Sequence, residues 1–354
     1  MTRVVGTEGG DPASAKRVVI AGAFAGLVSR FVIAPLDVIK IRLQLQPIPT
    51  FTPTLPTTAS STLTAVPPPP PLYRGILPTL IRILREETIT GLWKGNIPAE
   101  LLYITYGAAQ FLTYRHLTTA LDSSAFPFHN TLHPSLKYFI SGGLAGAAAT
   151  TVSYPFDLLR TRFAAQANGD RRIYTSILHS IGQIRHSEGY AGFFRGWGAG
   201  VTQIVPYMGL VFTTHEATKK FLGDKLDSES KILDAVSGGL AGVVAKTGTF
   251  PLDLIRKRLQ VQGPTRTRYI LGDRLPIYSG IWRTAADVIR AEGPRGLYRG
   301  LAVSLVKAAP LSAAFFLFPI YFTFLDLYNT REGYDTLTLF HSIIKNIHDI
   351  IIII

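Results

Sequence analysis

Long apolar runs alternate with shorter polar segments along most of the chain. Six runs have about 20 residues each, enough for a helix to cross a hydrocarbon core of about 30 Å. They predict six long helices, at about 16–44, 96–121, 135–164, 199–222, 232–262 and 301–325. Amphipathic segments predict three short helices, near 77–85, 174–187 and 278–291. The pattern is typical of an all-α membrane protein.

One sequence element returns three times, at the end of the first, third and fifth long helices. It reads PLDVIKIRLQ at 35–44, PFDLLRTRFA at 155–164 and PLDLIRKRLQ at 251–260. Each copy has an acid two residues after its proline, and bases five and seven residues after it. A second element follows each copy, as ETITGLWKG, EGYAGFFRG and EGPRGLYRG. Repetition this regular predicts three copies of one structural unit of about a hundred residues.

The domain organisation follows from these repeats. We expect repeats at 16–125, 132–224 and 230–327, a disordered N-terminus at 1–15, and a tail at 328–354 that matches no part of the repeat. Residues 47–71 are an insertion rich in proline and threonine, because 52 residues separate Pro35 from Glu87 where the other repeats have 33 and 41. Its proline density predicts a loop or a polyproline stretch.

Composition and charge placement support the membrane assignment. Hydrophobic residues make up 47% of the chain and charged residues 17%, and the mean hydropathy is +0.24. The net charge is +13, and 22 of the 36 lysines and arginines lie in three segments, at 40–95, 160–195 and 256–299. These segments connect the two long helices of each repeat, as the positive-inside rule requires. This placement and the lipid-length runs argue against a soluble nucleic-acid-binding protein.

Enzymatic chemistry has no support in the sequence. The chain has no cysteine, which excludes disulfides and thiol chemistry. We find no metal-ligand cluster, no nucleophile–base pairing and no phosphate-cradling loop. The chain is therefore not expected to be an enzyme, to hold a metal or to need a cofactor.

The charged positions of the first element predict a ring. The acid and the first base of each copy are three residues apart and share one helix face. Around a pseudo-threefold axis, six such side chains can alternate in sign: Asp37, Lys40, Asp157, Arg160, Asp253 and Arg256. The three prolines each remove a backbone donor, so we expect Pro35, Pro155 and Pro251 to kink their helices toward that axis.

Two cations lie inside the predicted spans. Arg30 and Lys246 occupy equivalent positions, two helical turns before their ring acids and on the same face, and Thr150 takes this place in the second repeat. A charge within a span costs about 2.5–3.5 kcal/mol on insertion scales and usually marks a transport pathway. The alternative is that both side chains extend to the membrane interface.

Both elements, in triplicate, resemble those of the mitochondrial carrier family over about residues 16–325. The resemblance implies six transmembrane helices and three short matrix helices in a pseudo-threefold bundle. It also implies a monomeric solute carrier of the mitochondrial inner membrane that works by alternating access. Six spans would place both termini on one side, the intermembrane space.

The resemblance gives the charge ring a role as a matrix gate. It implies the ion pairs Asp37–Arg160, Asp157–Arg256 and Asp253–Lys40. Gln44 and Gln260 would brace the gate, whereas Ala164, at the equivalent position of the second repeat, could not. The alternative is a structural clamp that never opens.

The second elements imply lipid sites at the start of the even-numbered long helices. Free backbone amides and the positive helix end favour a phosphate there, and the resemblance implies cardiolipin. The residues concerned are Trp93, Lys94, Gly95, Phe194, Arg195, Gly196, Tyr298, Arg299 and Gly300. The alternative is an interfacial aromatic residue with a base that extends to the headgroups. Thr88 departs from the family pattern, which usually has glycine at this position.

The resemblance also places a central substrate site. It adds the level marked by Leu102, Gln203 and Lys307 on the even-numbered long helices, with Tyr106 and Tyr207 one turn beyond the first two. The candidate substrate-binding residues are Arg30, Lys246, Lys307, Gln203, Tyr106 and Tyr207. Cations and aromatic rings suit a phosphorylated anion that carries a ring. Helix packing is an equal alternative for the tyrosines.

Within the family, four strings resemble most closely the fungal carriers of thiamine pyrophosphate: IKIRLQL, WKGNIP, LLYITYGAAQF and VSYPFDLLRTR. This implies thiamine pyrophosphate as the imported substrate, exchanged for another phosphorylated anion. The alternatives are an adenine-nucleotide or coenzyme A carrier, or a membrane adaptor that kept the fold without transporting.

Overall fold

The computed structural model describes residues 12–47, 71–73, 75–122, 134–167, 172–223 and 231–307. These residues form α-helices and short 3₁₀ helices, and they contain no strand beyond one isolated antiparallel bridge between Gln166 and Tyr269. They fall into two compact units. One unit holds α1 as far as Ala34 together with the described residues from Leu305 onward, and the other runs from Pro35 to Ser304.

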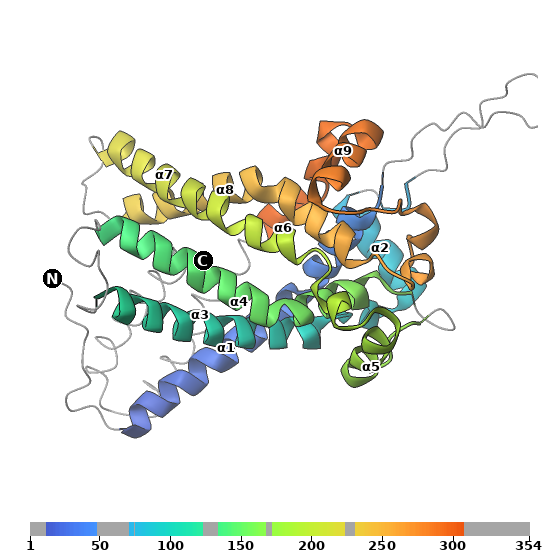
Figure 1. Ribbon diagram of the computed structural model, residues 1–354, viewed down its shortest axis with the longest axis horizontal. Helices are drawn as coiled ribbons and strands as arrows, with labels where there is room; N and C mark the ends of the chain where they lie inside the picture. Colours follow the sequence, from blue (N-terminus) through green and yellow to red (C-terminus); the bar gives the residue numbers. More distant parts are fainter. Residues whose placement is uncertain are drawn as a thin grey trace, which may run out of the picture. The chain divides into compact units, whose positions relative to one another are not determined.

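The long helices agree with the predicted ones in position. They are α1 (Pro12–Leu45), α3 (Asn96–Asp122), α4 (Pro134–Ala165), α7 (Ile204–Gly223) and α8 (Lys231–Gln260). Within the second unit, α3 packs along α4 and α7 packs along α8 (Figure 1). Pro35, Pro155 and Pro251 lie inside continuous helices, and the kinks expected at them remain predictions.

Length and hydropathy decide whether a helix qualifies as a membrane span. None of those in the described residues is both long enough and apolar enough to qualify as a membrane span. The six spans therefore remain a prediction.

Three short helices appear where the amphipathic pattern predicts them: α2 (Ile76–Glu87), α5 (Ile177–Glu188) and α9 (Ile281–Glu292). Each is followed by a 3₁₀ helix within the second element, η1 (Ile89–Trp93), η3 (Tyr190–Phe194) and η6 (Pro294–Tyr298). Two more, η4 (Arg266–Arg268) and η5 (Gly272–Arg274), lie in the link before α9.

The residue between each short helix and its 3₁₀ helix has a positive φ. Gly189 and Gly293 have φ of 68° and 71°, and Thr88 has a φ of 64° with a ψ of −178°. Glycine takes up this conformation without steric cost, but a β-branched residue is strained in it. The departure from the family pattern at Thr88 thus carries a conformational cost.

The helix predicted as continuous over 199–222 is divided in the structure. It consists of α6 (Trp197–Thr202) and α7, separated at Gln203. Pro206 explains the division, because proline has no N–H to donate and its ring clashes with the carbonyl four residues earlier, that of Thr202. Helical hydrogen bonds continue on both sides, from Gln203 N to Ala199 O at 3.2 Å and from Tyr207 N to Gln203 O at 3.1 Å.

The last described helix is α10 (Leu301–Val306), at the start of the helix predicted for 301–325. The remainder of that helix, the tail at 328–354, the predicted disordered segment apart from its last residues, and nearly all of the 47–71 insertion lie outside the described residues.

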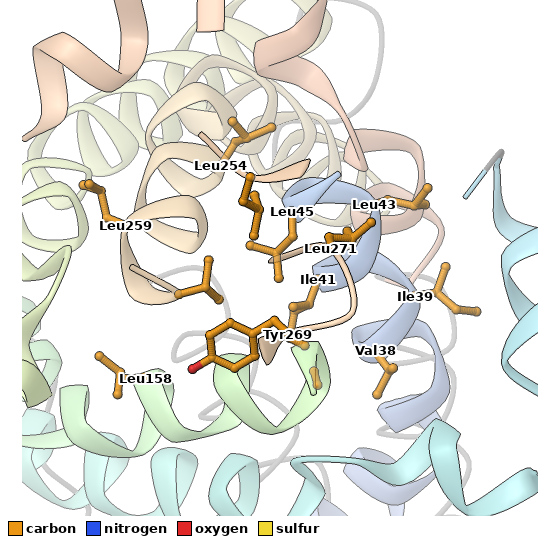
Figure 2. Close-up of a cluster of buried hydrophobic side chains, with 14 of the residues drawn as sticks. Val38, Ile39, Ile41, Leu43, Leu45, Leu158, Leu254, Leu259, Tyr269 and Leu271 are labelled. Carbon is orange, nitrogen blue, oxygen red and sulfur yellow. The ribbon is translucent and has the colours of Figure 1, made fainter. Parts of the chain in front are cut away.

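The core of the second unit lies where the three repeats meet. Figure 2 shows Ile41, Leu158 and Leu254, from α1, α4 and α8, among its buried side chains, with Tyr269 and Leu271 from the link before α9. Apolar side chains from the ends of all three proline-containing helices pack into this one cluster. The core therefore fixes the helix ends that carry the charged element.

Candidate functional site

The structure brings the predicted charge ring together within the second unit. Nη2 of Arg160 lies 2.5 Å from Oδ2 of Asp37, and Nη2 of Arg256 lies 2.9 Å from Oδ2 of Asp157. Nζ of Lys40 lies 2.8 Å from Oδ2 of Asp253. The pairs link α1 to α4, α4 to α8 and α8 to α1, so each pair joins two repeats and together they close a cycle.

Both glutamines expected to brace the ring do contact it. Gln44 Nε2 donates to Asp253 Oδ2 at 3.2 Å. Gln260 Nε2 donates to Asp157 Oδ2 and, at 3.2 Å, to the hydroxyl of Tyr154. The two glutamines differ in their carbonyl oxygens: that of Gln260 accepts from Thr161 Oγ1 at 2.6 Å, whereas that of Gln44 has no hydrogen-bond partner among the described residues.

Two further lysines contact the ring acids. Lys257 Nζ lies 2.9 Å from each carboxylate oxygen of Asp157. Lys246 Nζ, predicted to bind substrate, lies 3.4 Å from Asp253 Oδ2. At least five cations therefore contact the three ring acids. The prediction missed the role of Lys257, because the equivalent residues in the other repeats, Ile41 and Thr161, are uncharged.

Arg160 has an additional partner on α3. Its Nη1 donates to the hydroxyl of Tyr103 at 3.2 Å, and its guanidinium carbon lies 5.8 Å from the centre of that ring. An arginine above an aromatic face gains a cation–π contact beside its ion pair. Tyr103 thus supports the ring at the repeat where Ala164 provides no amide, a role that the sequence analysis did not assign.

A second set of buried ion pairs, which we call the arginine network, starts from arginines two residues after the ring bases on the same helices. The second base of each repeated element donates to both carboxylate oxygens of the glutamate that ends the following short helix: Arg42 to Glu87, Arg162 to Glu188 and Arg258 to Glu292. The three arginines are at most 1% exposed. Bidentate arginine–carboxylate pairs are among the strongest hydrogen-bonded contacts in proteins.

The arginine network also connects the repeats in a cycle. The Nε of Arg42, Arg162 and Arg258 donates to the backbone carbonyl of the next repeated element, at Ala164, Gln260 and Gln44, over 3.0, 3.0 and 3.2 Å. Each arginine is thus bonded within its own repeat through a glutamate and to the next repeat through a carbonyl. Removing Arg258 would break the buried ion pair of Glu292, a change that typically costs 3–5 kcal/mol. Glu87 and Glu188 would each keep a second cation, Lys94 and Arg195.

Glu87 of the network stays ionised because of these bonds. Burial favours the neutral form of Glu87, but the hydrogen bonds and charge of Arg42, with those of Lys94, outweigh it and hold the pKa of Glu87 below its ordinary value. The sequence carried a signal for this network, since the base and the glutamate recur in every repeat, but the spacing alone did not show that they meet.

A family model described as mitochondrial carrier protein matches three segments, at residues 11–124, 132–226 and 228–331, which together make up most of the chain. The chain belongs to the mitochondrial carrier protein family. The resemblance inferred from the repeated elements is confirmed, and the family is one of transporters.

Curated relatives of this mitochondrial carrier are identical to it at more than half of the aligned positions. "Mitochondrial thiamine pyrophosphate carrier 1" of Phaeosphaeria nodorum is 56% identical over 301 residues, which cover 85% of this chain and 89% of the relative. Proteins of the same name from Neurospora crassa and Aspergillus oryzae are 53% and 52% identical over 306 and 303 residues. These alignments cover 86% of this chain, and 89% and 91% of the two relatives.

The bases predicted to bind lipid in this carrier make contacts inside the protein. Lys94 Nζ bonds Glu87 Oε2 at 2.6 Å and the carbonyl of Gln166 at 2.9 Å. Arg299 Nη1 donates to the carbonyl of Gln46 at 2.7 Å, and Arg195, which is more exposed, bonds Glu188. The side chains of Lys94 and Arg299 thus join neighbouring repeats, and the assignment of the second elements to lipid remains a prediction.

The glycines beside these bases have a packing role that the prediction did not include. Gly95 and Gly196 have φ of 83° and 79°. A Cβ on Gly95 would lie 2.7 Å from the carbonyl oxygen of Arg160, and one on Gly196 would lie 3.0 Å from that of Arg256. Glycine therefore lets the second element approach the backbone of the charge ring.

The six candidate substrate residues are divided between the two units. Arg30 and Lys307 belong to the first, and Lys246, Gln203, Tyr106 and Tyr207 belong to the second. Within the second unit, Gln203 Nε2 donates to Thr249 Oγ1 at 3.4 Å, which links the junction of α6 and α7 to α8. That all six converge on one cavity remains a prediction.

Proposed function

We propose that this chain imports thiamine pyrophosphate into the mitochondrial matrix, in exchange for another phosphorylated anion. The observation that carries the proposal is the closed cycle of ion pairs between repeats, with Lys246, a candidate substrate-binding cation, in contact with one of its acids. The identity of the substrate is inferred from the relatives, which are named thiamine pyrophosphate carriers and align over most of the chain.

The charge ring serves as the gate on the matrix side, and its three ion pairs hold that gate closed. Opening must separate all three pairs, because each joins two different repeats. At 2.8 Å the gross Coulomb energy of one pair is about 6 kcal/mol at an effective dielectric constant of 20. Desolvation of both partners offsets much of this energy, so the net energy of each pair is far smaller. A gate of this kind holds when closed and can still open.

The remaining assignments complete the proposal. The carrier is a monomer that crosses the inner membrane six times, with both termini on the intermembrane-space side. Cardiolipin binds through the backbone amides at the starts of α3, α6 and α10, since Lys94 and Arg299 are engaged elsewhere. Arg30, Lys246 and Lys307 hold the diphosphate, and Tyr106 and Tyr207 face the rings of the vitamin.

Uptake by the purified carrier in liposomes tests the proposal. We expect uptake of labelled thiamine pyrophosphate against internal nucleotide, with weak competition by free thiamine, and a loss of at least about tenfold in apparent affinity in Lys307→Ala. Lys307→Arg should lose less, because it keeps the charge but changes reach and donor geometry.

Two outcomes would contradict it. Good transport of ATP or coenzyme A without thiamine pyrophosphate would keep the carrier and reject the substrate. A correctly folded chain that transports none of the three would instead support an adaptor.

A further inference from the structure

The carboxylate of Asp157 contacts three donor side chains that all come from about one turn of α8. Arg256 Nη2 and Lys257 Nζ each lie 2.9 Å from it, and Gln260 Nε2 donates to the same carboxylate. Lys257 Nζ is held in place by Thr161 Oγ1 at 3.0 Å and by Gln260 Oε1 at 3.1 Å. Two cations and an amide thus converge on one anion.

The equivalent positions of the other repeats lack this combination. The first repeat has Lys40, Ile41 and Gln44, with one cation and one amide. The second has Arg160, Thr161 and Ala164, with one cation and no amide. Of the three repeated elements, the one on α8 is therefore the most complete anion-binding group.

Opening of the gate would leave this group without its anion. Asp157 belongs to α4, whereas all three donors belong to α8, so separation of the two helices removes the carboxylate and keeps the donors together. The side chains of Arg256 and Lys257 are 17% and 8% exposed. Two neighbouring cations repel each other once the carboxylate between them has gone, so another anion that takes its place is favoured.

We propose that Arg256, Lys257 and Gln260 form a second anion station, which takes up the diphosphate of the substrate when Asp157 withdraws. This inference rests on the proposed function, because it needs a phosphorylated substrate that passes the gate. Phosphate oxygens accept the same charge-assisted hydrogen bonds as a carboxylate. The arginine would donate them through its planar guanidinium group, and the lysine through its ammonium group. The substrate thereby stabilises the open gate that releases it.

A purely structural role for Lys257 makes the opposite prediction. If Lys257 only held the gate closed, its loss would ease opening and speed transport. If it receives the diphosphate, its loss removes a contact of the open state and slows transport. Thr is the natural residue at this position in the second repeat, so Lys257→Thr is the appropriate change.

Binding of inorganic pyrophosphate tests the site directly. Asp157→Asn removes the internal anion, and Asp37→Asn is the matched control, since it exposes the element of α4 with a single cation. By thermal shift we expect pyrophosphate to bind Asp157→Asn at least about tenfold more tightly than Asp37→Asn. Adding Lys257→Thr to Asp157→Asn should abolish that gain. Equal binding by the two single variants, or a gain that survives Lys257→Thr, would overturn the inference.

Transport provides a second test if Asp157→Asn does not fold. For Lys257→Thr alone, we expect the maximal rate of exchange to fall at least about tenfold with KM changed less than about threefold. An unchanged or faster maximal rate would reject the station and leave Lys257 a structural contact. The two proposals can fail separately, because pyrophosphate binding needs no transport. Lys257-dependent binding without thiamine pyrophosphate uptake would keep the station and reject the substrate.

Discussion

The two glutamines of the charge ring look equivalent in sequence but should contribute unequally to the closed gate. Gln260 makes four side-chain hydrogen bonds, to Asp157, Tyr154, Thr161 and Lys257, and two of these partners are charged. A bond to a charged group contributes about 1.5–3 kcal/mol. Three of the partners lie on α4, so those bonds are lost when α4 and α8 separate.

Gln44 presents a different balance. Its amide nitrogen donates to Asp253 at 3.2 Å, again a charged partner. Its carbonyl oxygen is buried without a hydrogen-bond partner among the described residues, which costs about 1–3 kcal/mol. The free energy gained from the hydrogen bond to Asp253 and the cost of the unpaired carbonyl oxygen are of similar size and largely cancel. We therefore expect Gln260→Ala to shift the closed–open equilibrium toward open at least about tenfold, and Gln44→Ala to shift it less than about threefold.

An engineered cysteine can report this equilibrium, because the chain has none of its own. Ala164 occupies the equivalent position in the second repeat and is completely buried, so a cysteine there should react with a maleimide only when the gate opens. The rate of labelling of Ala164→Cys is compared in the presence and absence of each glutamine substitution. Equal acceleration by the two substitutions, or acceleration by Gln44→Ala alone, would refute the reasoning from hydrogen bonds.

Three further changes test other parts of the structure. Asp37→Lys should abolish uptake in liposomes by placing two cations together, and adding Arg160→Asp should restore part of it; a double variant as inactive as the single one, with both folded, would show that this pair is not part of a gate. Thr88→Gly should raise the melting temperature by about 1–3 °C, because relief of about 1–3 kcal/mol of backbone strain exceeds the conformational entropy that glycine adds to the unfolded chain. Gly189→Thr should lower the melting temperature. A lower melting temperature for Thr88→Gly would show that threonine is not strained there. Gly95→Ala should lower the melting temperature by several degrees, because its Cβ would lie 2.7 Å from the carbonyl oxygen of Arg160; an unchanged value would mean that the second element can shift at little cost.

The sequence predicted the parts of the fold that depend on periodicity and on repetition. Long and short helices appear in the predicted order, because apolar runs, amphipathic segments and the repeated proline and glycine positions determine structure locally. The pairs of the charge ring were implied by family resemblance and meet as expected, for instance Asp37 with Arg160. By contrast, the division of α6 from α7 was missed, because the apolar run masked the local effect of Pro206.

Contacts that depend on three-dimensional neighbours could not be predicted. Lys94 was assigned to lipid because its place at a helix start favours a phosphate, yet its side chain turns to Glu87 and to the carbonyl of Gln166. The arginine network was visible only as an unassigned base and an unassigned glutamate in each repeat. Nothing in the spacing of Arg42 and Glu87 requires them to pair, since the partner is set by how α2 packs against the end of α1.

Symmetry separates the residues that hold the repeats together from those that would meet a substrate. The arginine network has the same residue types in all three repeats, and at each junction it bonds one repeat to the next. At the candidate substrate positions the repeats differ: Arg30, Thr150 and Lys246 on the odd helices, and Leu102, Gln203 and Lys307 on the even ones. A substrate with a diphosphate at one end and rings at the other presents different chemistry to the three repeats, so three identical side chains would leave part of it unmatched. The same argument applies to α8, where Lys257 breaks the symmetry of the charge ring with an added cation. An asymmetric anion is therefore the kind of ligand for which this departure has a use, and a purely structural ring would have no need of it.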